Sequence, residues 1–125
     1  MKRMLNLLAG TALAVAGISA TAGDSRAEFI NVLTGGTSGV YYPLGVALAE
    51  LYAGGIEDAR AQVQATKASV ENLNLLSAGR GEVAFALGDS VMAAWAGDRE
   101  AGFQSELTNL RAIGGIYDNY IQIVA

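Results

Sequence analysis

The chain has 125 residues, of which 52% are hydrophobic, and it carries a formal net charge of −4 with no histidine and no cysteine. This length fits one domain, and the acidic balance argues against a nucleic-acid-binding protein, which needs clustered Lys and Arg side chains. The missing residue types exclude histidine-based triads, histidine-ligated metals, thiolate chemistry, disulfides and a lipid anchor on cysteine.

Residues 1–22 have the pattern of a secretory signal peptide. Two basic residues precede an apolar run over residues 4–18, and an A-x-A cleavage site ends at Ala22. A membrane helix is the alternative, but the run is shorter than the ~20 apolar residues that span a bilayer. We therefore expect export to a bacterial-type periplasm and a mature domain over residues 23–125.

The mature chain contains three predicted strand–loop–helix cycles. The strands are expected at residues 29–35, 59–66 and 82–87, which are short and either apolar or alternately apolar and polar. The helices are expected to begin around Pro43, at Ser69, and at Asp89 or Ser90, and to end at Gly54 and Gly55, at Gly79, and near Gly97. The first helix has apolar residues at i, i+3, i+4 and i+7, which predict a buried face of Leu44, Ala47, Leu48 and Leu51.

A polar loop and two apolar runs follow the third helix. Residues 98–108 are mostly polar, whereas residues 110–117 and 120–124 are apolar runs of strand length. The chain stops inside the second run, so we expect an incomplete domain. The three cycles predict an α/β fold, a parallel sheet with right-handed crossovers and flanking helices.

In such a sheet, ligands bind beyond the carboxyl ends of the strands. Three loops would lie at that edge: residues 35–43 (loop one), 66–69 (loop two) and 88–90 (loop three). Loop one lies within TGGTSGVYYPLG, which combines four glycines, two tyrosines and the chain's one proline. The candidate site is therefore expected at these three loops.

Loop one fails three enzyme motifs at named positions. A Walker loop needs a lysine after its glycines, and none follows here. A dinucleotide fingerprint would have Thr34 where it needs its first glycine. A nucleophile elbow around Ser38 would have Val40 where it needs glycine, and no histidine could act as base. A hydrolase using Ser38 stays the weaker alternative to a binding protein.

The residues of loop one suit an anion instead. Glycines let backbone N–H groups approach a ligand, Thr37 and Ser38 add hydroxyls, and a helix beginning near Pro43 offers the positive end of its dipole. Tyr41 and Tyr42 can add an apolar wall and a phenol donor. The alternative is that the glycines only make turns and the tyrosines only pack in the core.

Three blocks resemble the opening half of the TAXI-type solute receptors of TRAP (tripartite ATP-independent periplasmic) transporters. They are GGTSGVYYPLGVALAELY, VQATKASVENLNLLSAG and GEVAFALGDSVMAAWAG, and the resemblance covers residues 30–124. Many members carry Gln-Ser-Asp where this chain has Leu87, Gly88 and Asp89, so only the aspartate matches. Many also carry glycine at the position of Ala68.

The resemblance implies the first lobe of a two-lobed, type II periplasmic-binding-protein-like receptor, with the second lobe absent from this sequence. It implies a non-enzymatic protein without a cofactor, a small organic acid as ligand (an acidic amino acid or a dicarboxylate) and the membrane subunits of a TRAP transporter as partner. A periplasmic sensor or a surface antigen built on the same lobe is the alternative.

Applied to this sequence, the resemblance and the loop argument assign ligand contacts to Gly36, Thr37, Ser38, Gly39, Tyr42, Ser69, Asn72 and Asp89. Tyr42 is preferred to Tyr41. Ser69 could instead be only a helix cap, Asn72 only a first-turn residue, and Asp89 only the cap of the third helix. Trp95 is expected in the core.

Overall fold

The computed structural model describes residues 27–120 and residue 123. The predicted signal peptide and most of the last apolar run lie outside the described residues. Along the chain the elements are β1 (Phe29–Leu33), α1 (Tyr41–Gly55), β2 (Arg60–Gln64), α2 (Ser69–Ser77), β3 (Val83–Ala84) and α3 (Gly88–Ala96). This alternation confirms the predicted α/β class. None of the helices within residues 27–120 is long and apolar enough to cross a membrane.

The three strands form one parallel sheet in the order β2-β1-β3. β1 is central, and its residues from Ile30 to Leu33 are buried, as expected for a strand with neighbours on both sides. Its register runs from Phe29 opposite Arg60 to Leu33 opposite Gln64. Because all strands are parallel, their carboxyl ends lie at one edge, and the three loops begin there.

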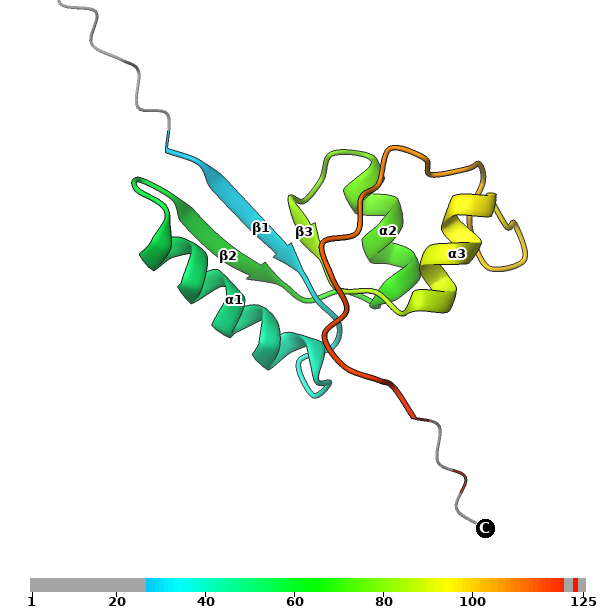
Figure 1. Cartoon of the computed structure of the whole chain (residues 1–125), viewed down its shortest axis with the longest axis horizontal. Coiled ribbons are helices and arrows are strands. Elements are labelled where there is room, and N and C mark those ends of the chain that lie inside the picture. The colour runs from blue at the N-terminus through cyan, green and yellow to red at the C-terminus, as the bar shows by residue number, and fades with distance from the viewer. Residues whose placement is uncertain (1–26, 121–122, 124–125) are drawn as a thin grey trace, which may run out of the picture.

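Helix α1 packs along β1 and β2, and α2 packs against β3 and α3 (Figure 1). The core under α1 contains Ile30, Val32, Ala49 and Phe85, with Leu44, Leu48 and Tyr52 packed against it. The predicted apolar face was therefore wrong at Ala47, which is exposed, and at Leu51, which is 71% exposed. The stripe that faces the core instead follows Tyr41, Gly45, Leu48, Ala49 and Tyr52, which lie at i, i+4, i+7, i+8 and i+11 on one face of the helix.

A second core lies between α2, α3 and the loop that follows them. Leu73, Ala94 and Phe103 are its buried members. Phe103 is fully buried although it belongs to the predicted polar loop, and the Leu107 N–H donates to the Ala94 carbonyl at 2.9 Å. Trp95 was expected in the core but is 50% exposed, since its neighbour Ala94 takes the inward position on α3.

All three strands of the sheet are shorter than predicted, and the strand predicted at residues 110–117 does not form. Only Val83 and Ala84 of the third expected strand pair with β1, and the chain then turns into α3. Residues 110–117 form no strand, since no neighbouring strand pairs with them, and their apolar side chains Ile113 and Ile116 are exposed. In Figure 1 this segment passes β3 and then approaches the loop that precedes α1.

Candidate functional site

The three loops meet at the carboxyl edge of the sheet, as the topology predicted. A Cβ placed on Gly35 of loop one would lie 3.4 Å from the Ala68 Cβ of loop two. The Ser69 side chain hydrogen-bonds to the side chain of Tyr41, and its Oγ accepts the Leu87 N–H at 3.0 Å, immediately before loop three. Direct contacts therefore connect loop one to loop two and loop two to the start of α3.

Loop one presents unpaired hydrogen-bond donors to solvent. Its Gly39 N–H donates to the Gly36 carbonyl at 2.9 Å, which closes a turn over exposed residues. Within the described part of the chain, the N–H groups and hydroxyls of Thr37 and Ser38 have no hydrogen-bond partner. Helix α1 follows directly, and its N-cap Val40 supplies no side-chain cap. Such a row of free donors at a helix start favours a negatively charged group.

Neither backbone conformation nor close packing requires glycine at position 36, the first residue of this turn. A Cβ on Gly36 would meet nothing within 4 Å, and a Cβ on Gly39 would meet the Gly36 carbonyl oxygen at 3.3 Å. Neither residue has the positive φ that favours glycine. A side chain at position 36 would therefore extend into open space beside loop one.

Tyr41, rather than Tyr42, lies where the loops meet. Its ring stacks on Phe85 with centroids 5.4 Å apart, and Tyr117 lies at 6.5 Å on another side. Burial raises the pKa of the Tyr41 phenol, Tyr117 and Asp89 raise it further, and the hydrogen bond with Ser69 opposes them. The phenol is therefore protonated at neutral pH and can donate a hydrogen bond.

The expected helix caps are differently placed. Ser69 is the first residue of α2, and its Oγ caps the neighbouring helix by accepting the Leu87 N–H, where Leu87 is the N-cap of α3. Neither Asp89 nor Ser90 is that N-cap. Asp89 instead lies exposed in the first turn, where its carboxylate accepts the Ser90 N–H at 2.6 Å.

Asn72 lies below the site rather than on its surface. Its side chain is 0% exposed. The Asn72 Nδ2 donates to the Thr34 and Phe85 carbonyls at 2.5 and 2.8 Å, and its Oδ1 lies 2.6 Å from the Thr66 Oγ1. These bonds use the whole amide within the protein, so in this structure no part of Asn72 faces a ligand.

Loop two contains a strained residue. Ala68 has φ 68° and ψ −145°, a region that favours glycine. Its N–H donates to the Thr66 Oγ1 at 3.0 Å, and the neighbouring Lys67 N–H donates to the Glu71 carboxylate at 2.6 Å. The backbone donors of Lys67 and Ala68 are thus paired, whereas those of Thr37 and Ser38 in loop one have no partner among the described residues.

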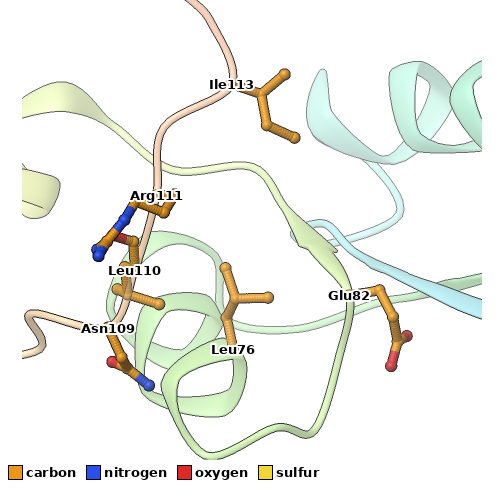
Figure 2. Close-up of a pocket in the computed structure, with 6 residues that line it drawn as sticks. All are labelled: Leu76, Glu82, Asn109, Leu110, Arg111 and Ile113. Atoms are coloured by element: carbon orange, nitrogen blue, oxygen red, sulfur yellow. The ribbon is translucent and has the colours of Figure 1, made fainter.

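A hollow of about 320 Å³ lies elsewhere, around Leu76, Glu82, Asn109, Leu110, Arg111 and Ile113 (Figure 2). It is near the amino end of β3, away from the three loops. The Arg111 guanidinium donates to the carbonyls of Thr108 and Leu110, and the Glu82 carboxylate accepts the Asn31 N–H. Its charged groups therefore serve local backbone contacts.

A comparison with protein families gives one match that bears on this edge. The model of the NMT1-like family matches residues 32–125, which is more than half of the chain. The match begins inside β1 and includes all three loops. The matched family is one of solute-binding-like proteins.

Proposed function

The chain belongs to the NMT1-like family, and from this we propose that it is an extracytoplasmic receptor that captures a small organic acid for a TRAP-type secondary transporter. The observation that carries the proposal is loop one, where the N–H groups and hydroxyls of Thr37 and Ser38 are exposed and have no partner among the described residues. A ligand carboxylate would supply the acceptors that these groups lack.

The neighbouring groups favour an acid with a second polar function. Gly36, Thr37, Ser38 and Gly39 would surround one carboxylate at the start of α1. Across the junction, the Tyr41 phenol and the Asp89 carboxylate offer a hydrogen-bond donor and an anion, which suit a hydroxyl or an ammonium group. An acidic amino acid, or a dicarboxylate bearing a hydroxyl, would fit both sides.

Three sequence-based assignments change in this proposal. Tyr41 replaces Tyr42 as the tyrosine of the site, because Tyr41 is the one in contact with Ser69 and near Asp89. Ser69 is 7% exposed, so it would orient the Tyr41 phenol rather than bind the ligand over a large area. Asn72 has no exposed surface and is left out of the ligand contacts.

The setting of the site follows from the resemblance to TAXI-type receptors. We propose that this lobe faces a second lobe across the ligand, that the protein acts in the periplasm and that its partner is the membrane part of the transporter. The predicted signal peptide would export it, and sequencing the exported protein from its N-terminus should then begin at Gly23. A mature protein that retains Met1 would contradict the export step.

Ligand capture is tested by thermal unfolding and calorimetry with acidic amino acids and dicarboxylates, each beside its uncharged amide. We expect the acids alone to raise the unfolding temperature. Gly36→Val should remove this effect if the added side chain occupies the open space where we propose that the carboxylate binds. Gly54→Val is the matched control, since Gly54 also has nothing within 4 Å of an added Cβ but lies at the far end of α1. Equal responses in both variants would refute the assignment of loop one.

A membrane-spanning transport protein encoded beside this gene would support transport. A neighbouring gene for a kinase or a chemoreceptor would instead favour the alternative of a periplasmic sensor.

A further inference from the structure

We propose that Asn72 is the positioning residue of the site: a buried side chain that holds the ends of all three strands, and with them the three loops, in one arrangement. The proposal rests on the proposed function for its meaning in binding. Its structural content, the fixing of the loops, stands on the hydrogen bonds alone and can be measured without a ligand.

The three partners of the Asn72 amide come from three different strand ends. The Thr34 carbonyl directly follows β1, the Phe85 carbonyl directly follows β3, and the Thr66 hydroxyl lies two residues after β2. The two hydrogens of Nδ2 meet the two carbonyls, and Oδ1 meets the hydroxyl. One side chain thus joins β1, β2 and β3 where the sheet ends.

Backbone bonds from the Thr34 and Thr66 N–H groups to the Gln64 and Gly35 carbonyls continue the pairing of β1 with β2, but the sheet holds the end of β3 by few bonds. The pairing of β1 with β3 is confined to Val32 with Val83 and Leu33 with Ala84. At the carboxyl end, one further bond extends it, from the Phe85 N–H to the Leu33 carbonyl. Without Asn72, the Phe85 carbonyl would lie unpaired in the interior, and the Thr34 carbonyl would keep only the Thr66 hydroxyl, at 3.0 Å. Buried carbonyl groups need partners.

Asn72 is itself firmly placed. It lies in the first turn of α2, and its N–H donates to the Ala68 carbonyl at 2.9 Å. One turn earlier, Ser69 connects Leu87 and Tyr41. The start of α2 is therefore the common support of the loops, and it acts from beneath because the side chain of Asn72 is 0% exposed.

The test is amide hydrogen exchange by NMR on the full chain without ligand, comparing Asn72→Ala with Leu73→Ala. Three amides report on the carboxyl edge: Thr34, which bonds to Gln64; Thr66, which bonds to Gly35; and Leu87, which bonds to Ser69. The Arg60 amide, which bonds to Glu28, reports on the opposite edge. Leu73 is the control because it is buried on the same helix but packs into the second core.

We expect Asn72→Ala to speed exchange at the three edge amides by about ten-fold relative to Arg60, since a buried polar network loses its central member. Leu73→Ala should change all four amides by similar factors, because it lowers the stability of the whole fold. The proposal is overturned if Asn72→Ala gives the uniform pattern of the control.

A second readout connects the hydrogen bonds of Asn72 to ligand binding, with L-glutamate as the probe. Asn72→Ala should weaken binding at least as much as Gly36→Val, whereas Leu73→Ala should retain it at temperatures where it is folded. If neither the unmodified chain nor Leu73→Ala binds L-glutamate, the ligand proposal fails. The exchange pattern still decides the role of Asn72 in that case.

Thr66→Val keeps the test decisive if Asn72→Ala does not fold. This change keeps the volume but removes the hydroxyl that faces Asn72 Oδ1 and accepts the Ala68 N–H. It should speed exchange at the Thr66 and Thr34 amides relative to Arg60. Unchanged exchange rates at the Thr66 and Thr34 amides in Thr66→Val would overturn the proposed role of Asn72.

Discussion

At the scale of single residues, glycine occupies different positions of this chain for different physical reasons. A Cβ on Gly45 would lie 2.3 Å from Thr34 Cγ2, so this glycine lets α1 pack against the end of β1. Gly97 has φ +66°, which favours glycine at the end of α3. Gly36 has neither a close neighbour nor a positive φ. The fold therefore explains the first two glycines, and approach of a ligand is our explanation for the third.

The strain at Ala68 leads to a stability prediction. Ala68→Gly should raise the free energy of unfolding by about 1 kcal/mol, because the relief of a strained backbone outweighs the added entropy of the unfolded chain. Ala78→Gly should lower it by about 0.5–1 kcal/mol, since Ala78 has φ −84° and gains nothing from glycine. Urea unfolding measures both, and a loss of stability in Ala68→Gly would contradict the role of the strain.

The raised pKa of Tyr41 predicts a loss of stability in alkali. The folded-state pKa of the Tyr41 phenol lies above the ordinary tyrosine value of 10.0, chiefly because of burial, so the folded protein holds this proton more tightly than the unfolded chain. The resulting stabilisation is fully present below pH 10 and is lost as pH rises through the folded pKa. Unfolding measured across this range should show a smaller alkaline loss in Tyr41→Phe. An equal loss in both proteins would show that Tyr41 is not the group responsible.

At the scale of elements, local sequence patterns correctly predicted the features that depend on neighbouring residues in the chain. The order of strands and helices, and the glycine ends of α2 and α3, follow from periodicity and from Gly79 and Gly97. The caps could not be assigned correctly, because the acceptor for Leu87 is Ser69, which lies on another helix. The strand predicted at residues 110–117 failed for a similar reason. An apolar run becomes a strand only where a neighbour pairs with it.

The cap that crosses between helices gives a prediction at this scale. Ser69→Ala should lower the free energy of unfolding by about 1 kcal/mol, because the Leu87 N–H at the start of α3 loses its acceptor. Ser90→Ala should change it by less than about 0.5 kcal/mol, since the Asp89 carboxylate still accepts the Ser90 backbone N–H. Equal effects in chemical unfolding would show that the Ser69 bond does not stabilise α3.

At the scale of the whole molecule, the meeting of the three loops was predictable from the sequence and the contacts that hold them together were not. Parallel strands end at one edge, so the sequence could place loops one, two and three together. It could not show that Tyr41 rather than Tyr42 meets Ser69, since both tyrosines lie in the first turn of α1. Nor could it show that Asn72 joins three strand ends, because its partners lie up to 38 residues away along the chain.

The surface of the molecule also bears on affinity. Loop one is open to solvent, and several apolar side chains near the end of the described chain are exposed: Ile113, Ile116, Tyr117, Tyr120 and Ile123. In the proposed two-lobed receptor, this lobe would cover a ligand from one side only. We therefore expect this chain to bind acids weakly, near the millimolar range that corresponds to about −4 kcal/mol, and to be prone to association through these apolar residues.

The central claim is that an organic acid binds at loop one, and NMR titration of the backbone amides with L-glutamate tests it most directly, because the method detects weak binding residue by residue. We predict shifts at Thr37, Ser38 and Tyr41 and in the first turn of α3, with none in Gly36→Val and the same shifts in Gly54→Val. Shifts centred on the hollow near Arg111, or shifts that persist unchanged in Gly36→Val, would contradict the account.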